Sequence, residues 1–256
     1  MTSKTEVATK ANNATTAVAM FDDKLPAHIN QGAGRGSEGV GTEDMIIPRL
    51  GLCQSLSPQR KKTNSEYIEG IEEGDLFNTL TGELYGKSIV IVPVLFKKEY
   101  LVWVKRDGGG SSGNGFRGAY PTELMAAQAK AELDDGDKCE IVETASNFCL
   151  IIKPDGTTEE IVVSMAKSQM KASRKWNSLI RMSGGDRFSR GYELSGIEES
   201  SDKGDYFGFG IRQLGFTPED IFAKSVALYD DIKTGTKVAD SSGAKVKTTD
   251  EVEDEF

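Results

Sequence analysis

Hydrophobic residues dominate one long segment, from Ile89 to Val104, and this segment is the strongest strand candidate. Its first half, Ile89 to Phe96, is the longest uninterrupted apolar run and is apolar on both faces, which is typical of a buried strand. Because Pro93 has no N–H to donate, it predicts a bulge or a sheet edge within the run.

Shorter alternating runs predict further strands. Phe148 to Lys153 and Glu160 to Met165 flank the turn sequence Pro154-Asp155-Gly156, so they are expected to form a hairpin. Gly191 to Ile197 and Asp205 to Gln213 are two more candidates. The second of these contains glycines between aromatic residues, and we interpret it as a curved sheet strand rather than an RNA-binding strand.

Helical periodicity is confined to three segments. Thr122 to Leu133 predicts a short helix, and Met165 to Met182 fits a longer one. The last helix is expected to have Thr217 as its N-cap, Pro218 as its first residue and Gly235 as its stop. Many strands with few helices indicate a mainly β protein with helical additions, of the α+β class, built on a small β-barrel or sandwich.

The two ends of the chain differ from the middle. Residues 1–44 are rich in Ala, Thr, Asn and Gly, and we expect a flexible N-terminal segment there. Residues 45–234 are expected to form a single domain. Residues 235–256 are predicted to be a disordered acidic tail.

Composition excludes several classes of protein. The apolar run of eight residues is far shorter than the roughly 20 needed to cross a membrane, and the N-terminus lacks the apolar core of a secretory signal. Three cysteines and a single histidine, His28, argue against a disulfide scaffold, a Cys/His zinc site and a Ser-His-Asp triad. No metal, cofactor or membrane partner is therefore expected, and we predict a reducing compartment, the cytoplasm.

The formal net charge of -9 argues against a nucleic-acid partner, but the charge is segregated. Residues 161–192 carry seven basic groups and one acid, Asp186. On a helix from Met165 to Met182, four of the basic groups fall on one stripe and Trp176 falls on the opposite side, where we expect it to anchor the core. The stripe is either a surface that tracks phosphates or an ordinary solvated basic face. Its members are Lys167, Lys171, Arg174 and Arg181, and Arg187 and Phe188 follow in a loop.

A second candidate site lies at the end of the long strand. Trp103 and Lys105 share one face, whereas Tyr100 points to the other. A ring beside a cation is what a single-strand binder needs, because the ring stacks a base and the cation meets a phosphate. The equally weighted alternative is a Trp103 packed in the core. The basic and aromatic residues of this segment are Lys97, Lys98, Tyr100, Trp103, Lys105 and Arg106.

Residues 113–118 read Gly-Asn-Gly-Phe-Arg-Gly and match the GxGxxG pattern of dinucleotide-binding proteins. That pattern functions only directly between a strand and a helix, and here a long segment precedes it and Pro121 follows it. We interpret it as a loop. No pair of carboxylates is singled out as a general acid and base, so the sequence does not indicate an enzyme.

The acidic tail ends in Asp254, Glu255 and Phe256, and such a tip resembles the tails of phage-encoded single-stranded-DNA-binding proteins. The middle of the chain is similar to phage proteins of the same class. Its matching segments are Ile47 to Leu50, Gln54 to Pro58, Gly74 to Thr79, Trp103 before Gly108 to Gly110, and Lys175 to Asn177.

This resemblance implies an OB-like barrel that binds single-stranded DNA without strict sequence preference and without catalysis. The tip would compete for the basic surface and recruit replication proteins, a polymerase or a helicase-primase. Homo-oligomerisation stays open, as does a preference for DNA over RNA. The rival hypothesis is a phage structural or virion-associated interaction protein with no nucleic-acid site.

Overall fold

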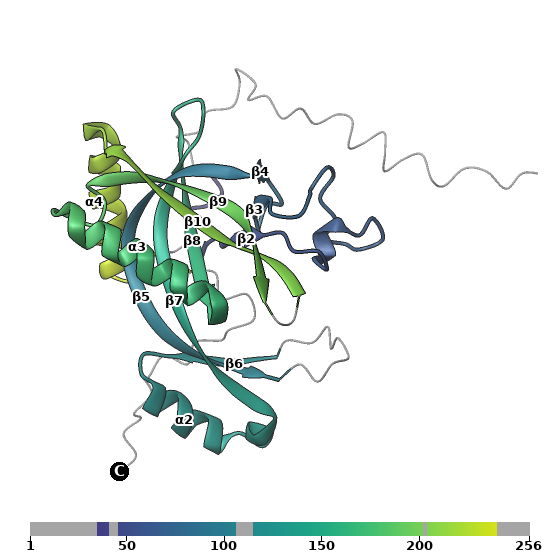
Figure 1. Cartoon of the computed structure of the whole chain (residues 1–256). Helices are drawn as coiled ribbons and strands as arrows, with labels where there is room; N and C mark the ends of the chain where they lie inside the picture. Colours follow the sequence, from purple (N-terminus) through teal and green to yellow (C-terminus); the bar gives the residue numbers. More distant parts are fainter. Residues whose placement is uncertain (1–34, 41–45, 106–114, 202–203, 240–256) are drawn as a thin grey trace, which may run out of the picture. The chain divides into compact units, whose positions relative to one another are not determined.

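The computed structural model describes residues 35–40, 46–105, 115–201 and 204–239 (Figure 1). The chain divides into two units, Met1–Gly41 and Thr42–Phe256, and all that follows concerns the second. Strands prevail over the three α-helices among its described residues, so the predicted mainly β, α+β class is confirmed.

The main sheet contains six antiparallel strands. Its register shifts between Pro93 and Leu95, which is the predicted bulge. The predicted hairpin around residues 154–156 is also confirmed. In order across the sheet the strands are β10 (Gly204–Phe216), β9 (Arg190–Ser201), β5 (Ser88–Val104), β7 (Cys139–Ile152) and β8 (Thr158–Ala166), while β6 (Phe116–Tyr120) also pairs with β5.

This sheet is open in the part of the chain that the structure describes. β8 and β10 lie at opposite ends of the strand order and do not pair, so these residues do not form the predicted closed barrel. Instead α3 (Met170–Ser183) packs between them: Trp176 shares a core cluster with Met165 of β8 and Phe209 of β10. A packed helix therefore covers the opening that a pairing of β8 with β10 would have closed.

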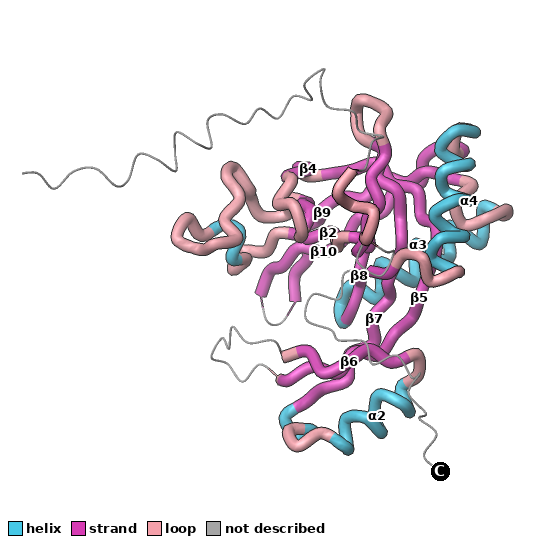
Figure 2. The backbone as a smooth tube through the Cα atoms, turned by 180° about the vertical axis from the view of Figure 1, so that it is seen from behind, coloured by secondary structure: helices cyan, strands magenta, loops and turns pink. Residues whose placement is uncertain are grey.

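Side-chain alternation along β5 places successive residues on opposite faces of the sheet. Ile91 belongs to the cluster under α3, whereas Val92 belongs to a second cluster under α4 (Glu219–Lys233). A third, smaller cluster contains Val102 and lies under α2 (Glu123–Glu132). Figure 2 shows α2 at the far end of β5 and β7 from α3 and α4.

The helix boundaries differ in part from the predicted ones. The short helix is confirmed, with the Thr122 hydroxyl accepting the N–H of Met125. α3 starts later than predicted, because the chain first makes a 3₁₀ turn, η4 (Lys167–Gln169), after β8. α4 begins after Pro218 rather than Thr217, since the Thr217 hydroxyl donates to the Phe188 carbonyl and does not cap the helix.

Short elements cover the edges of the main sheet. β2 (Leu50–Leu52), β3 (Leu76–Asn78) and β4 (Leu84–Gly86) form a three-stranded sheet. The 3₁₀ turn η2 (Pro58–Arg60) lies between β2 and β3 in the chain. β1 (Ile46–Ile47) pairs in parallel with β11 (Val238–Ala239), so strand pairing continues beyond residue 234. The Gln54 amide bonds both backbone groups of Phe207 on the outer edge of β10, at 2.8 and 2.9 Å.

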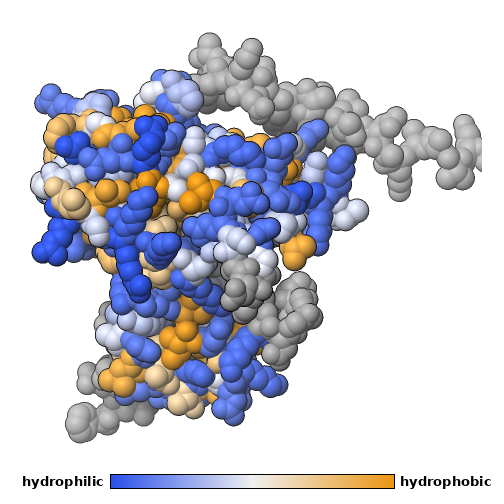
Figure 3. All heavy atoms as spheres, viewed as in Figure 1, coloured by the Kyte–Doolittle hydropathy of each residue, from blue (hydrophilic) through white to orange (hydrophobic). Residues whose placement is uncertain are grey.

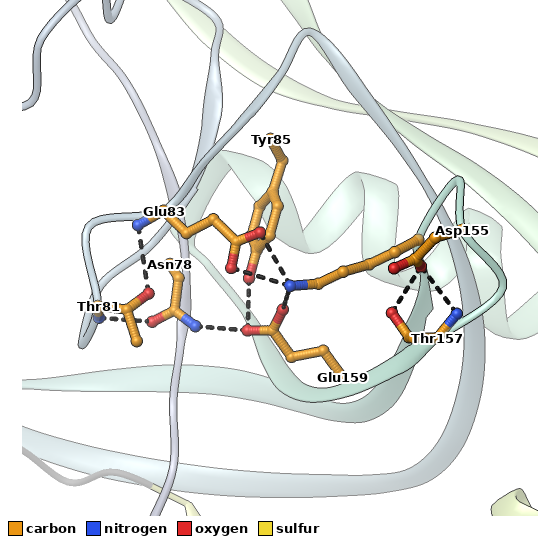
Figure 4. Close-up of polar contacts among 8 residues, drawn as sticks. Asn78, Thr81, Glu83, Tyr85, Asp155, Thr157 and Glu159 are labelled. Carbon is orange, nitrogen blue, oxygen red and sulfur yellow. Dashed lines mark hydrogen bonds and ion pairs between the residues drawn. The ribbon is translucent and has the colours of Figure 1, made fainter. Parts of the chain in front are cut away.

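A polar network fastens β3 and β4 to the β7–β8 hairpin (Figure 4). The Glu159 carboxylate accepts hydrogen bonds from Asn78 and Tyr85, both at 2.7 Å, and pairs with Lys153 at 2.8 Å. Burial opposes ionisation of Glu159, but these donors outweigh it and hold its pKa below the ordinary value. Burial and the bond to Glu159 raise the pKa of Tyr85, so the hydroxyl stays a donor.

Tyr85→Phe is expected to lower the free energy of unfolding by about 1.5–3 kcal/mol, because it removes a hydrogen bond to a charged group. Tyr206→Phe is the matched control, since its hydroxyl bonds Glu199 at 2.7 Å outside the network. The wild-type chain should lose stability as pH falls through the folded pKa of Glu159, because that pKa lies below the unfolded one. Denaturant unfolding at several pH values checks both effects, and an equal loss in the two variants would contradict the network's role.

Candidate nucleic-acid interface

The outer surface of α3 carries four exposed cations on one stripe, Lys171, Arg174, Lys175 and Arg181, here called the α3 stripe. α3 contains no acidic residue, and none of the four has an ion-pair partner among the described residues. Hydrophilic residues gather over this helix (Figure 3). Like charges three and four residues apart slightly destabilise a helix, so the stripe does not contribute to the stability of α3.

Trp176 faces the opposite way from the stripe and is fully buried. Its ring meets that of Tyr192 edge-on, with a centroid distance of 5.8 Å. The prediction that Trp176 anchors the core rather than stacking on a base is confirmed. α3 is therefore held by its apolar side, which leaves the stripe free to face solvent.

The N-terminal part of β7 has an open edge. β8 pairs with β7 only from Thr144 onward, so Cys139 to Glu143 have β5 alone as a partner strand in the described structure. Two adjoining pockets, of about 380 and 450 Å³, lie along this edge and share Glu140, Val142 and Lys167 in their walls. We call the two pockets together the β7 groove.

The β7 groove brings together two regions that are far apart in the sequence. One pocket reaches Lys171 and Arg174 at the start of α3. The other reaches Trp103 and Lys105 at the end of β5. The two basic and aromatic candidates of the sequence are therefore neighbours on one surface.

Only one of the two aromatic candidates on β5 faces this groove. Trp103 is half-buried, and its ring meets Phe116 edge-on at 5.0 Å. Tyr100 points to the other side of the sheet, as predicted, and packs against the cluster of Val102 and Ala126. Trp103 is thus a candidate for base stacking, and Tyr100 contributes to the core beneath α2.

Several predicted phosphate ligands already have partners. Lys167 pairs with Glu140 at 2.8 Å, and Lys98 pairs with Glu143 at 2.6 Å, a contact that raises the pKa of Lys98. Lys97 stands over the ring of Phe148 at 5.2 Å. Within the described ranges, Lys105 bonds only the backbone oxygen of Asp137, at 3.3 Å. The cations of the groove without an acidic partner in the described residues are Lys105, Lys171 and Arg174.

Lys167 has an unusual backbone. Its φ is 52°, and no other described residue except glycine has a positive φ. Residues other than glycine rarely adopt a positive φ, and those that do are concentrated at functional sites. The conformation turns the chain from β8 into α3 at the wall that both pockets share.

Arg187 and Phe188 were predicted to bind nucleic acid, but their side chains point into the protein. Phe188 is only 7 % exposed and packs edge-on against Phe222 of α4, so it offers no face to a base. Arg187 donates to Asn147 at 2.7 Å and Asn177 at 2.9 Å, and burial lowers its pKa. The loop after α3 turns inward, which its composition did not indicate.

A protein-family model described as Pam3 phage gp34-like protein matches residues 14–238. The chain belongs to this phage family. No curated protein and no solved structure matches it. The Pam3 gp34-like match covers the α3 stripe and the β7 groove, and it does not reach the acidic tip. The family description names a phage and no activity, so the function rests on the site.

Within this Pam3 gp34-like chain, some predicted residues lie outside the described ranges. They are Arg106 and the tip residues Asp254, Glu255 and Phe256. No described helix has the length and apolarity that crossing a membrane requires. The described residues also hold no cluster of three metal-ligating side chains.

Three features of this surface were not predicted from the sequence. Lys175 belongs to the α3 stripe, and helical spacing from Lys171 was a signal that could have found it. Glu140 and Val142 line the groove only because β8 ends early, and no local pattern predicts that pairing. The ion pairs of Lys98 and Lys167 likewise join segments that are remote in sequence.

Proposed function

We propose that the chain is a non-enzymatic single-stranded-DNA-binding protein of phage replication or recombination. The observation that carries this proposal is the β7 groove, where cations from the end of β5 and the start of α3 meet beside the half-buried ring of Trp103, and these cations have no acidic partner among the described residues. Cations that track the backbone and a ring that stacks a base are the two parts of a single-strand site. Neither part reads base edges, so the proposal includes binding without strict sequence preference.

In this arrangement a base stacks on Trp103 and the following phosphates run past Lys171 and Arg174 along the α3 stripe. The pairs of Lys167 with Glu140 and Lys98 with Glu143 neutralise the acids beside this path, so they do not repel the phosphates. The path needs the open edge of β7 and does not need the closed OB-like barrel that the resemblance implies.

The acidic tip completes the proposal. Asp254 and Glu255 would occupy the basic surface when DNA is absent, and Phe256 would then be released to meet a polymerase or a helicase-primase. The rival function, a virion-associated interaction protein, needs none of the groove's features. Abundance in purified virions without affinity for oligo-dT would favour that rival and overturn the proposal.

Fluorescence separates the two tryptophans. Because Trp176 is fully buried, quenching by oligo-dT should come from Trp103. Trp103→Phe should therefore abolish most of the quenching while it keeps a stacking ring. Trp103→Ala should weaken binding by about 1–3 kcal/mol, the usual value of one stacked base.

Affinity for this test is measured independently by fluorescence anisotropy of a labelled oligo-dT. Two results would contradict the stacking role of Trp103: quenching that persists in Trp103→Phe, or an unchanged affinity of Trp103→Ala. Thermal melts of both variants verify that they remain folded.

A further inference from the structure

Phe216, near the end of β10, is the one aromatic side chain among the described residues that is exposed rather than buried or half-buried. Its exposed fraction is 71 %. The Arg190 guanidinium lies over its ring, 3.8 Å from the centroid. Arg190 has no acidic partner in the described structure, and its buried Nε has no hydrogen-bond partner there.

The backbone holds this pair in place. The register of β9 and β10 shifts between Gln213 and Phe216, and after the shift Phe216 lies directly opposite Arg190. Irregular pairing of this kind redirects side chains at a strand end. The Thr217 N–H then bonds the Ser189 carbonyl at 3.0 Å, which fixes the strand end behind the ring. The ring is thus held by its surroundings while most of its surface meets solvent.

The pair lies at the C-terminal end of α3. The hydroxyl of Ser183, the last residue of α3, donates to the Gln213 side chain at 3.1 Å, three residues before Phe216. Trp103 lies across the β7 groove from the other end of α3, where Lys171 and Arg174 line the wall. The α3 stripe therefore runs between two aromatic side chains.

We propose that the Arg190–Phe216 pair is a second base-stacking platform for the strand that binds Trp103 and the α3 stripe, an inference that rests on the proposed function. Arg190 covers one face of the ring and supplies a positive charge, and a base stacks on the free face. α3 is about 21 Å long, and a stacked strand rises about 3.4 Å per nucleotide. About six such steps span the helix, so a strand stacked at this spacing needs about seven nucleotides to reach both platforms.

The test compares the affinities of Phe216→Leu and Phe216→Trp for oligo-dT of about 4 and about 12 nucleotides. Phe216→Leu keeps an apolar side chain but loses the π face, so it should bind the longer oligonucleotide roughly 5- to 100-fold more weakly. Phe216→Trp should bind it at least as tightly as wild type. Leu56→Ala, which changes an exposed apolar side chain between β2 and η2, should leave affinity unchanged.

A second measurement reports directly whether a base stacks on the side chain at position 216. In a Trp103→Phe background, Phe216→Trp should restore quenching by the longer oligonucleotide. If the wild type binds oligo-dT in a manner that depends on the α3 stripe, but Phe216→Leu binds as tightly, the second platform is refuted and the proposed function stands. If the wild type does not bind oligo-dT, both are refuted.

Discussion

Replacing the four cations of the α3 stripe with Gln should weaken oligo-dT binding by about 100-fold at physiological salt, because each phosphate contact releases counterions. The slope of log affinity against log salt, which is negative, should become shallower by about 3. Stability should change little, since the four side chains are exposed and have no acidic partners in the described structure. The substitutions are Lys171→Gln, Arg174→Gln, Lys175→Gln and Arg181→Gln.

A matched variant controls for the loss of positive charge itself. It neutralises the same number of cations elsewhere, each without an acidic partner among the described residues. It should keep nearly full affinity and a nearly unchanged salt slope. If both variants lose affinity equally, the stripe is not a site and the protein responds only to net charge. The control substitutions are Lys61→Gln, Lys62→Gln, Lys130→Gln and Lys224→Gln.

Trp176→Ala should lower the free energy of unfolding by about 3–5 kcal/mol, the largest stability loss expected from one substitution here. The ring is fully buried between α3 and the sheet and packs on Tyr192. α3 has no other fully buried aromatic anchor, and its charged side opposes helix formation. Such a loss is a large fraction of the stability of a typical domain.

Two comparisons sharpen this expectation in denaturant unfolding. Trp176→Phe should cost much less than Trp176→Ala, because it keeps apolar bulk and removes an indole N–H that has no partner in the described residues. Trp103→Ala should also cost less, since that ring is only half-buried. A Trp176→Ala loss no larger than that of Trp103→Ala would contradict the assigned roles of the two tryptophans.

The long strand, the hairpin and the short helix were predictable because each is encoded locally. The run from Ile89 to Val104 and the turn at residues 154–156 are signals that need no partner. The inward position of Trp176 also followed from spacing on a single helix. These features required no knowledge of what lies opposite.

The rest depends on contacts between remote segments. An open sheet instead of a barrel follows from how β8 and β10 meet α3, which no short pattern encodes. Phe188 occupies a Gly/Ser-rich loop, a composition typical of surface, yet it enters the core beside α4. Lys98 and Lys167 count as free charges in a sequence, and only the fold supplies their partners.

Titration of the full chain with oligo-dT across a salt series, followed by intrinsic tryptophan fluorescence, shows whether the protein binds single-stranded DNA through the groove and the stripe. Binding should quench the fluorescence, and the affinity should fall linearly in log salt with a slope of about -3.5, from the five cations of the groove and the stripe that have no acidic partner among the described residues. The absence of quenching, or an affinity that does not change with salt, would contradict it.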